Sequence, residues 1–240
     1  MCGCAPLFHR QNDFERGLQL YEQKQYEAAK DYFEAYHTQH PDFDSALYYL
    51  FNCYKNLNDP EAQIVTLEKL ARKETPDENV YLNLAYYYRK YERCRDLYRL
   101  LSEYPETLLG RLDSCIALTR QLFAELICGA ATVTTDADPM IYAISKGYLP
   151  RFPDGRLYAS DTINYAHLIV LLDRLIEPYY PRRLSPMKNI SSKSYLYLPY
   201  MRLVDRGIIQ FDPYIVPEHS APLSIAVEAV TAMAKRGIFD

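Results

Sequence analysis

Apolar residues recur at helical spacing through the first half of the chain. From Asp13 to Cys128 they return every three or four positions, which places them along one face of an α-helix. Proline, which lacks the N–H that a helix interior requires, interrupts this pattern at intervals. The interruptions lie at Pro41, Pro60, Pro76 and Pro105. The pattern therefore predicts short helices joined by turns, and with them an all-α fold.

The proline spacing indicates that a helix–turn–helix unit repeats. Pro41 and Pro76 are 35 residues apart, and Pro76 and Pro105 are 29 residues apart. A period of about 34 residues is typical of helix–turn–helix arrays. Since one such unit cannot bury its apolar face alone, we expect successive units to stack. The shorter second interval predicts a third unit that is several residues short between its helices.

Three successive segments share one arrangement of small, aromatic and aliphatic residues. Its members are Gly17, Tyr26, Ala29, Phe33 and Pro41 in the first segment, Leu47, Leu50, Tyr54, Ala62, Leu67 and Pro76 in the second, and Leu84, Ala85, Tyr88, Cys94, Leu101 and Pro105 in the third. The segments resemble tetratricopeptide repeats (TPR), helix hairpins that stack into a solenoid. In this resemblance Gly17 is the small residue that lets the paired helix approach, opposite Ala29 and Phe33. The apolar segment 107–128 is then expected to be the terminal helix of the array or a bridge to the second domain.

The resemblance to TPR proteins implies a binding groove. In that family the first helices of successive units line a concave groove that holds a peptide or a partner helix. Carried over by alignment, the groove residues here are Tyr21, Tyr48, Asn52, Lys55, Tyr86, Arg89 and Lys90. Aromatic rings beside an amide and cations suit an extended peptide backbone or its acidic groups. The alternative for the same residues is a solvated face with packed tyrosines.

A different unit repeats in the second half of the chain. The residues that coincide at an offset of 60 include Pro139 with Pro199, Gly147 with Gly207, Pro153 with Pro213 and Ala166 with Ala226. Each copy is predicted to be a helix, a turn stopped by glycine, a loop and a second helix. The small, polar stretch 129–138 before the first copy is predicted to be a linker.

The first copy resembles an S-layer homology (SLH) motif. The resemblance rests on the helix end at Gly147, a left-handed cap position, and on the turn Pro153-Asp154-Gly155. Residues 161–162 (Asp-Thr) are predicted to cap a second helix over 163–176. SLH motifs bind cell-wall polymers, so the resemblance implies a bacterial cell-envelope location. It also implies, as an alternative function, binding of peptidoglycan or another wall polymer, although the arginine that the family uses is absent at 164–167.

Composition and charge narrow the function further. The chain has 240 residues, 49% of them hydrophobic, and a formal net charge of -4, which argues against a phosphate-backbone ligand. It has 24 tyrosines and no tryptophan. A tyrosine buries a large ring and keeps a polar tip, so it suits half-exposed packing faces and binding grooves. No apolar run is long enough to span a bilayer.

The cysteines suggest an anchor rather than a disulfide or a metal site. The four later cysteines each lie in an apolar helical pattern, where a free thiol packs as a small hydrophobic group. They are Cys53, Cys94, Cys115 and Cys128. In contrast, Cys2-Gly3-Cys4 has a small residue before a cysteine, as at a bacterial lipoprotein processing site. Cys2 or Cys4 is therefore a candidate for lipid attachment in a tail over residues 1–10, and an inert tail is the alternative.

Patterns for catalysis are absent from the sequence. The five histidines lack metal-ligand spacing, and neither a nucleophile elbow nor a glycine-rich phosphate loop occurs. We therefore expect no catalytic residue, no metal site and no cofactor. Four cations lie in the loop between the two SLH-like copies, at Arg182, Arg183, Lys188 and Lys193. They could meet an anionic wall polymer or lipid, or be solvated.

Together these patterns predict an all-α protein with three parts. A TPR array occupies 11–128, a linker 129–138, and an SLH-like helical module 139–240. The predicted function is a non-catalytic protein-interaction scaffold or assembly factor of the bacterial cell envelope, as a periplasmic protein or outer-membrane lipoprotein, with the cytoplasm as the alternative location. The predicted partners are a protein or peptide and, secondarily, a wall polymer. A lipid anchor would be the only membrane contact, and nucleic acid is not expected.

Overall fold

The computed structural model describes residues 12–73, 77–103, 106–131 and 138–239. These residues form helices and no strand, so the all-α prediction is confirmed. The helices are α1 (Asp13–Glu22), α2 (Tyr26–Gln39), α3 (Asp44–Asn56), α4 (Pro60–Ala71), α5 (Glu78–Lys90), α6 (Cys94–Ser102), α7 (Glu106–Leu112), α8 (Arg120–Ala130), α9 (Pro139–Ser145), α10 (Tyr165–Asp173), α11 (Tyr197–Asp205) and α12 (Leu223–Ala234). Cys2, Cys4, Pro76, Pro105 and the middle of the predicted linker lie outside the described residues.

The chain divides into two compact units, residues 1–87 and 88–240, with the division inside α5. Each unit is described by itself. The predicted domain limits at 128 and 138 differ from this division, and they stay a prediction.

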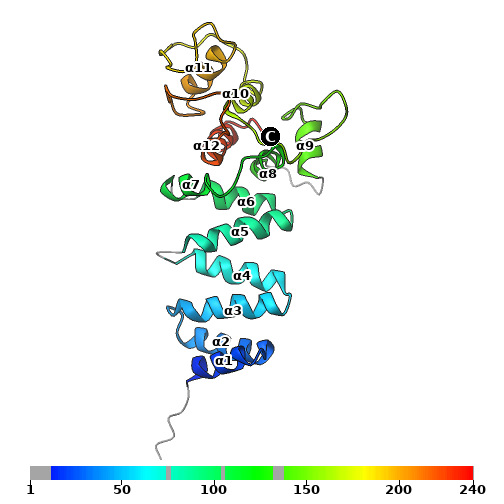
Figure 1. Cartoon of the computed structure of the whole chain (residues 1–240), viewed down its shortest axis with the longest axis vertical. Helices are drawn as coiled ribbons and strands as arrows, with labels where there is room; N and C mark the ends of the chain where they lie inside the picture. Colours follow the sequence, from blue (N-terminus) through cyan, green and yellow to red (C-terminus); the bar gives the residue numbers. More distant parts are fainter. Residues whose placement is uncertain (1–11, 74–76, 104–105, 132–137, 240) are drawn as a thin grey trace, which may run out of the picture. The chain divides into compact units, whose positions relative to one another are not determined.

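In the first unit, successive helices pack as hairpins. α1 packs on α2, α2 on α3 and α3 on α4, and Figure 1 shows them following one another in this order. Gly17 explains how closely α1 approaches α2, because a Cβ atom added there would lie 2.7 Å from Cε1 of Phe33. Ala29 and Phe33 are fully buried on the other side of the contact. The roles that the TPR resemblance gives to these three residues are confirmed.

The turns inside the hairpins repeat with a period of 34 residues. Lys24, Asn58 and Glu92 each have a positive φ, between 54° and 60°. The next residue in each turn donates its N–H back over the turn, as Gln25 does to the Leu20 carbonyl and Arg93 to the Tyr88 carbonyl. This left-handed ending closes a helix even where no glycine is present. The prediction that the third unit is several residues short between its helices was therefore wrong. The second helix of this unit, α6, is the short element.

An aromatic cluster fills the space between α1, α2 and α3. The Phe14 ring centroid lies 4.9 Å from that of Phe43, 5.3 Å from Tyr36 and 5.6 Å from Phe33. Phe33 in turn stacks on Tyr49 at 5.1 Å. Tilted and edge-on ring pairs of this kind stabilise a core beyond the area they bury. Many of the tyrosines and phenylalanines of the first unit are thus packing residues.

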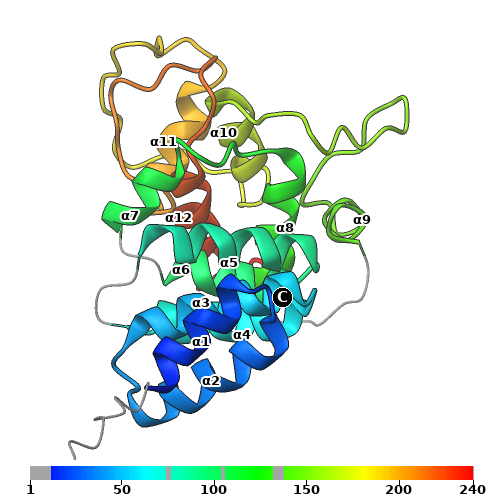
Figure 2. The same ribbon diagram turned by 60° about the horizontal axis from the view of Figure 1, so that its bottom comes forward.

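The second unit is built around α8, which packs against α6, α9 and α12. α10 packs on α11, and the segment between α9 and α10 leaves the helices as a long loop (Figure 2). α9 and α11 end in the same way. Gly147 and Gly207 have φ values of 77° and 60°, and the residue after each donates its N–H to a carbonyl of the helix. Gly147 is confirmed as a left-handed cap, and the 60-residue offset matches two helix ends of the same geometry.

Extended residues before α8, α10 and α12 pair with one another. Ile163 donates its N–H to the Leu118 carbonyl at 2.8 Å, and its own carbonyl accepts from the Ala221 N–H at 2.9 Å. Because residue 163 is extended, α10 begins at Tyr165, and Asn164 caps it by accepting from the His167 N–H. The predicted cap at 161–162 was therefore wrong, whereas the helix predicted over 163–176 is present but shorter, from Tyr165 to Asp173. Thr162 instead forms a bridge with Thr119.

The expected terminal helix over 107–128 is broken into α7 and α8. Asp113 lies in the break, where its two carboxylate oxygens accept from the N–H and the hydroxyl of Ser224 at 2.8 and 2.6 Å. It thereby caps the start of α12, far along the chain. Cys115, expected inside a helix, lies in the same break and is exposed.

α8 continues through Gly129 and Ala130, which the sequence pattern assigned to the linker. A Cβ atom at Gly129 would lie 2.1 Å from the Cys94 carbonyl oxygen and 2.6 Å from Cβ of Tyr98. The small residue therefore lets the backbones of α6 and α8 approach, which a larger side chain would prevent. The first two residues of the predicted linker therefore belong to α8, and Gly129 lies at its contact with α6.

Candidate functional site

Three of the predicted groove residues form one stripe on α3. Tyr48, Asn52 and Lys55 are four and three residues apart, the spacing of neighbours on a helix face. The opposite side of the helix, including Leu47 and Leu50, is buried. Tyr48 is 37% exposed, and Lys55 is exposed at the end of the stripe. This face of α3 is therefore presented to solvent or to a partner.

The polar groups of this stripe are the Asn52 amide, the Tyr48 hydroxyl and the Lys55 ammonium group. Asn52 donates from Nδ2 to the Tyr48 carbonyl at 2.9 Å, which orients its amide along the helix. Burial raises the pKa of the Tyr48 hydroxyl, and the negative charges of Asp77 and Asp44 raise it further. Tyr48 therefore stays protonated near neutral pH and can donate a hydrogen bond. Acidic groups lie near its end of the stripe, whereas Lys55 gives the other end a positive charge.

On α5, Tyr86 and Lys90 lie one turn apart and are both exposed, Tyr86 at 58%. The Tyr86 ring contacts that of Tyr87, which is buried. Lys90 lies 5.4 Å from the centroid of the Tyr91 ring. α5 thus presents an aromatic residue followed by a cation, as α3 does.

The two other predicted groove residues have partners within the chain. The Tyr21 ring packs edge-on against Tyr26 and Tyr49, at 5.5 and 5.3 Å, and burial raises the pKa of its hydroxyl. Arg89 donates from Nε to Oε2 of Glu125 at 2.9 Å, and this carboxylate is almost fully buried in α8. Both residues therefore stabilise the fold, whatever they contribute to a groove.

A buried polar network behind α3 was not predicted from the sequence. Gln63 of α4 accepts a hydrogen bond from the Tyr87 hydroxyl and donates from Nε2 to the Tyr54 carbonyl at 3.2 Å. Tyr54 in turn donates its hydroxyl to Glu34. A buried polar group is tolerated when it is bonded in this way, and the network fixes the relative positions of its helices. The only signal in the sequence was a glutamine among the apolar residues of α4.

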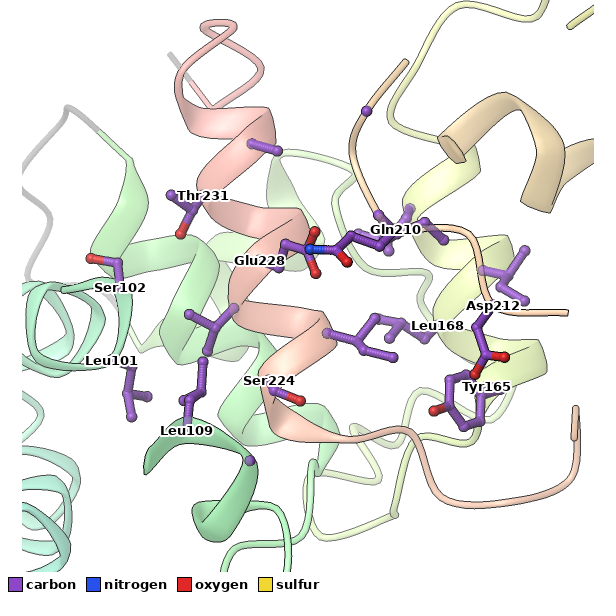
Figure 3. Close-up of a pocket in the computed structure, with 18 of the residues that line it drawn as sticks. Leu101, Ser102, Leu109, Tyr165, Leu168, Gln210, Asp212, Ser224, Glu228 and Thr231 are labelled. Carbon is purple, nitrogen blue, oxygen red and sulfur yellow. The ribbon is translucent and has the colours of Figure 1, made fainter. Parts of the chain in front are cut away.

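The second unit has a cleft of about 750 Å³ along α12. Its walls come from α10, α12 and the segment 207–215, together with residues of α6 and α7 (Figure 3). Gln210 and Glu228 point toward one another across it, and Tyr165 lies beside Asp212 at one end. The hydroxyl oxygen of Thr231 is buried with no hydrogen-bond partner among the described residues. Burial raises the pKa of the Tyr165 hydroxyl.

The size of this cleft lies in the range of small-molecule sites, but its apolar floor is already packed. Leu168, Ile169 and Val227 are buried by their neighbours in the chain itself. The cleft offers polar contacts at its rim, and we assign no ligand to it.

A smaller, polar cleft of about 350 Å³ lies at the start of α10. It is lined by amides and hydroxyls together with an imidazole, a carboxylate and the exposed Tyr195; the polar residues are Asn164, His167, Asn189, Ser191, Ser194 and Glu218. The SLH-like alignment places its ligand-binding sequence at 164–167, at this position. Such a mixture of amides, hydroxyls and one aromatic face can hydrogen-bond a polyhydroxylated ligand.

Among the described residues, no group of three or more His, Cys, Asp and Glu side chains is arranged to hold a metal ion. A search of the same residues finds no helix with the length and apolar character needed to cross a membrane. The expectations of no metal and no cofactor stay predictions.

Comparison with known proteins identifies one family. Residues 20–85 match the family model described as Tetratricopeptide repeat, and this range contains Tyr21, Tyr48, Asn52 and Lys55. No curated protein and no solved structure matches the chain. This match and the helix hairpins of the first unit support the resemblance to tetratricopeptide repeats, which in general mediate protein–protein interaction. The match does not extend to the second half, where the SLH resemblance stays a prediction.

Proposed function

We propose, from the tetratricopeptide repeat match at 20–85, that the first unit binds a partner protein through the stripe on α3 and the exposed Tyr86 of α5. The observation that carries this proposal is the stripe of Tyr48, Asn52 and Lys55, which faces away from the buried side of its helix. The protein would act as a non-catalytic scaffold or assembly factor.

The stripe favours an extended peptide with an acidic group. An exposed tyrosine supplies a large contact area at low conformational cost, and the Asn52 amide can pair with a peptide backbone. No ion pair of Lys55 is found among the described residues, so this ammonium group can meet a carboxylate. Because Asp44 and Asp77 act on Tyr48 at the other end, we expect the acidic group of the peptide to lie at the Lys55 end.

Truncation of the stripe should weaken partner binding without unfolding the protein. Proteins captured from a bacterial cell extract by the immobilised chain would be identified by quantitative mass spectrometry. The affinity of the main captured protein would then be measured with purified components. We expect Tyr48→Ala to lower this affinity by about 30-fold, the effect of losing one central interface tyrosine. Lys55→Gln should have a smaller effect that fades at high salt.

Tyr32→Ala provides the matched control, because Tyr32 on α2 is also 37% exposed. It should leave the affinity unchanged. An equal loss with Tyr32→Ala and Tyr48→Ala, or no loss with either, would show that the partner does not use this stripe. Arg89 is a poor choice for this test, since its replacement would also strand the buried Glu125 carboxylate.

A second candidate function is binding of a wall polymer in the bacterial envelope. It is supported by the polar cleft at the start of α10 and by the SLH resemblance of the segment before it. We propose the envelope as the location on the same grounds. The sequence Cys2-Gly3-Cys4 supports Cys2 or Cys4 as the lipid-bearing residue.

Sedimentation with purified peptidoglycan tests this second function. We expect the protein to enter the pellet, and Tyr195→Ala, which removes the exposed aromatic face of the cleft, to lower the bound fraction several-fold. Tyr214→Ala, an exposed tyrosine that does not line the cleft, is the control. A protein that stays in the supernatant would exclude wall binding, and the groove proposal would not be affected.

A further inference from the structure

Residues 178–196, which make up most of the loop between α10 and α11, carry charges of one sign and are called the basic loop. Between Glu177 and Asp205 the sequence contains no acidic residue. It contains five cations, which are Arg182, Arg183, Lys188, Lys193 and Arg202. Arg202 forms an ion pair with Asp173, so the four cations of this basic loop give the segment its charge. The excess is local, because the whole chain has a net charge of -4.

The basic loop is held in place at several points along its length. The Tyr179 hydroxyl and the Arg182 N–H both donate to Oδ2 of Asp205, at 3.0 and 3.2 Å. The Tyr197 hydroxyl donates to the Ser185 carbonyl at 3.0 Å. Pro181 and Ile190 are buried, so they also anchor the loop to the rest of the second unit. The side chains between these points are therefore presented outward from a defined backbone (yellow in Figure 2).

Large aromatic and aliphatic side chains are exposed beside the cations. Tyr180 is 70% exposed, and Leu184 is also exposed, directly after the two arginines. A second segment joins the loop here, because Lys188 donates its N–H to the Pro213 carbonyl at 2.8 Å. This contact places Tyr214, which is 64% exposed, next to the loop. Exposed apolar groups gathered beside a cationic segment call for a partner that takes both.

Four acidic residues lie near the basic loop: Glu177, Asp205, Asp212, and Glu218, which lines the polar cleft with Asn189, Ser191 and Ser194 of the loop. The Asp205 carboxylate accepts the two hydrogen bonds from the loop, and one oxygen of Asp212 accepts from the Tyr214 N–H at 2.8 Å. Glu177 stands at the start of the loop and is exposed. Arg182 and Arg183 are exposed, and no carboxylate among the described residues pairs with their guanidinium groups.

We propose that the basic loop docks the protein on an anionic lipid surface. Arginine and lysine are attracted to anionic headgroups, and tyrosine is favoured at the level of the headgroups, where its ring is apolar and its tip is wet. Leu184 beside the arginines can enter the acyl boundary, which an RNA or a wall polymer does not provide. The combination of cations with an exposed leucine is what favours lipid over a soluble polyanion. This docking goes beyond the groove proposed for the first unit.

Vesicle sedimentation tests the docking with the full chain, produced without lipid modification. The probe would be vesicles of phosphatidylcholine, with or without phosphatidylglycerol. We expect binding only to the phosphatidylglycerol vesicles. Arg182→Gln with Arg183→Gln should lower the partition coefficient by about 25-fold, since each cation near the surface contributes about five-fold. Leu184→Ser should lower the part of the binding that survives high salt, where charge attraction is screened.

Arg151→Gln with Arg156→Gln is the matched control, because both residues are exposed in another loop of the same unit. It removes the same charge and should leave the partition coefficient almost unchanged. Arg182→Lys with Arg183→Lys keeps both positive charges and should therefore retain binding. The proposal fails if the two double variants lose binding equally, or if phosphatidylcholine alone binds as well. Tighter binding to an RNA or to wall polymer than to vesicles of equal phosphate content would also overturn it.

Discussion

Replacing Gly129 with alanine is expected to destabilise the second unit by about 3 kcal/mol, at the upper end of the usual cost of overpacking. The added Cβ would lie 2.1 Å from the backbone oxygen of Cys94, which belongs to α6 and cannot rotate away as a side chain could. α6 and α8 would have to separate, and apolar contacts along their whole interface would be lost. Denaturant unfolding followed by far-UV circular dichroism measures the free energy change.

Gly110→Ala is the control for this substitution. A Cβ at Gly110 would meet no atom within 4 Å, and the residue is exposed inside α7. Alanine is favoured over glycine in a helix interior by about 0.5–1 kcal/mol, so this variant should be slightly more stable. If Gly129→Ala proved as stable as Gly110→Ala, the close approach of α6 and α8 would be wrong.

Arg120→Met should cost about 3 kcal/mol through the loss of its charge-assisted hydrogen bonds. The side chain is buried, and it donates from Nε to the Leu157 carbonyl and from Nη2 to the Pro150 carbonyl, both at 3.1 Å. Its guanidinium also lies 4.5 Å from the centroid of the Phe152 ring. Burial lowers the pKa of this guanidinium, because removing its charge from water is unfavourable. Part of the free energy gained from the hydrogen bonds therefore offsets this cost of burial. Hydrogen exchange should show faster opening of residues 150–158.

Two further variants separate charge from packing at this position. Arg120→Lys keeps the charge but cannot reach both carbonyls, so its stability should lie between wild type and methionine. Arg151→Met in the exposed part of the same loop should change stability by less than about 0.5 kcal/mol. An Arg120→Met protein with wild-type exchange over 150–158 would contradict the role of Arg120 in holding this loop.

The features that were predicted correctly depend on local sequence. The helices of the first unit follow from apolar periodicity, and Gly17 against Phe33 from the spacing of a repeat. The period of 34 was harder to find, because Lys24, Asn58 and Glu92 take the left-handed turn without glycine. The prolines therefore suggested a shorter third unit than the backbone has.

Other features depend on residues that meet only in three dimensions. Arg89 was assigned to the groove by alignment with the TPR family, and its ion pair could not be foreseen because Glu125 is 36 residues further along the chain. The cap of α10 was misplaced because Thr162 and Ile163 pair with segments of distant sequence and stay extended. The cleft along α12 is lined by five separate segments, so no single sequence motif predicts it.

The pairing of Leu118, Ile163 and Ala221 has a consequence for how the molecule reaches its fold. These residues are 45 and 58 positions apart, whereas each hairpin of the first unit closes between neighbouring helices. The entropy of closing a loop grows with its length, and topologies rich in distant contacts fold more slowly. The repeats can therefore form early, while the second unit waits until all three of its extended segments have met. During that interval the hairpins of the first unit, with the stripe proposed to bind a partner, would already be present on a half-folded chain.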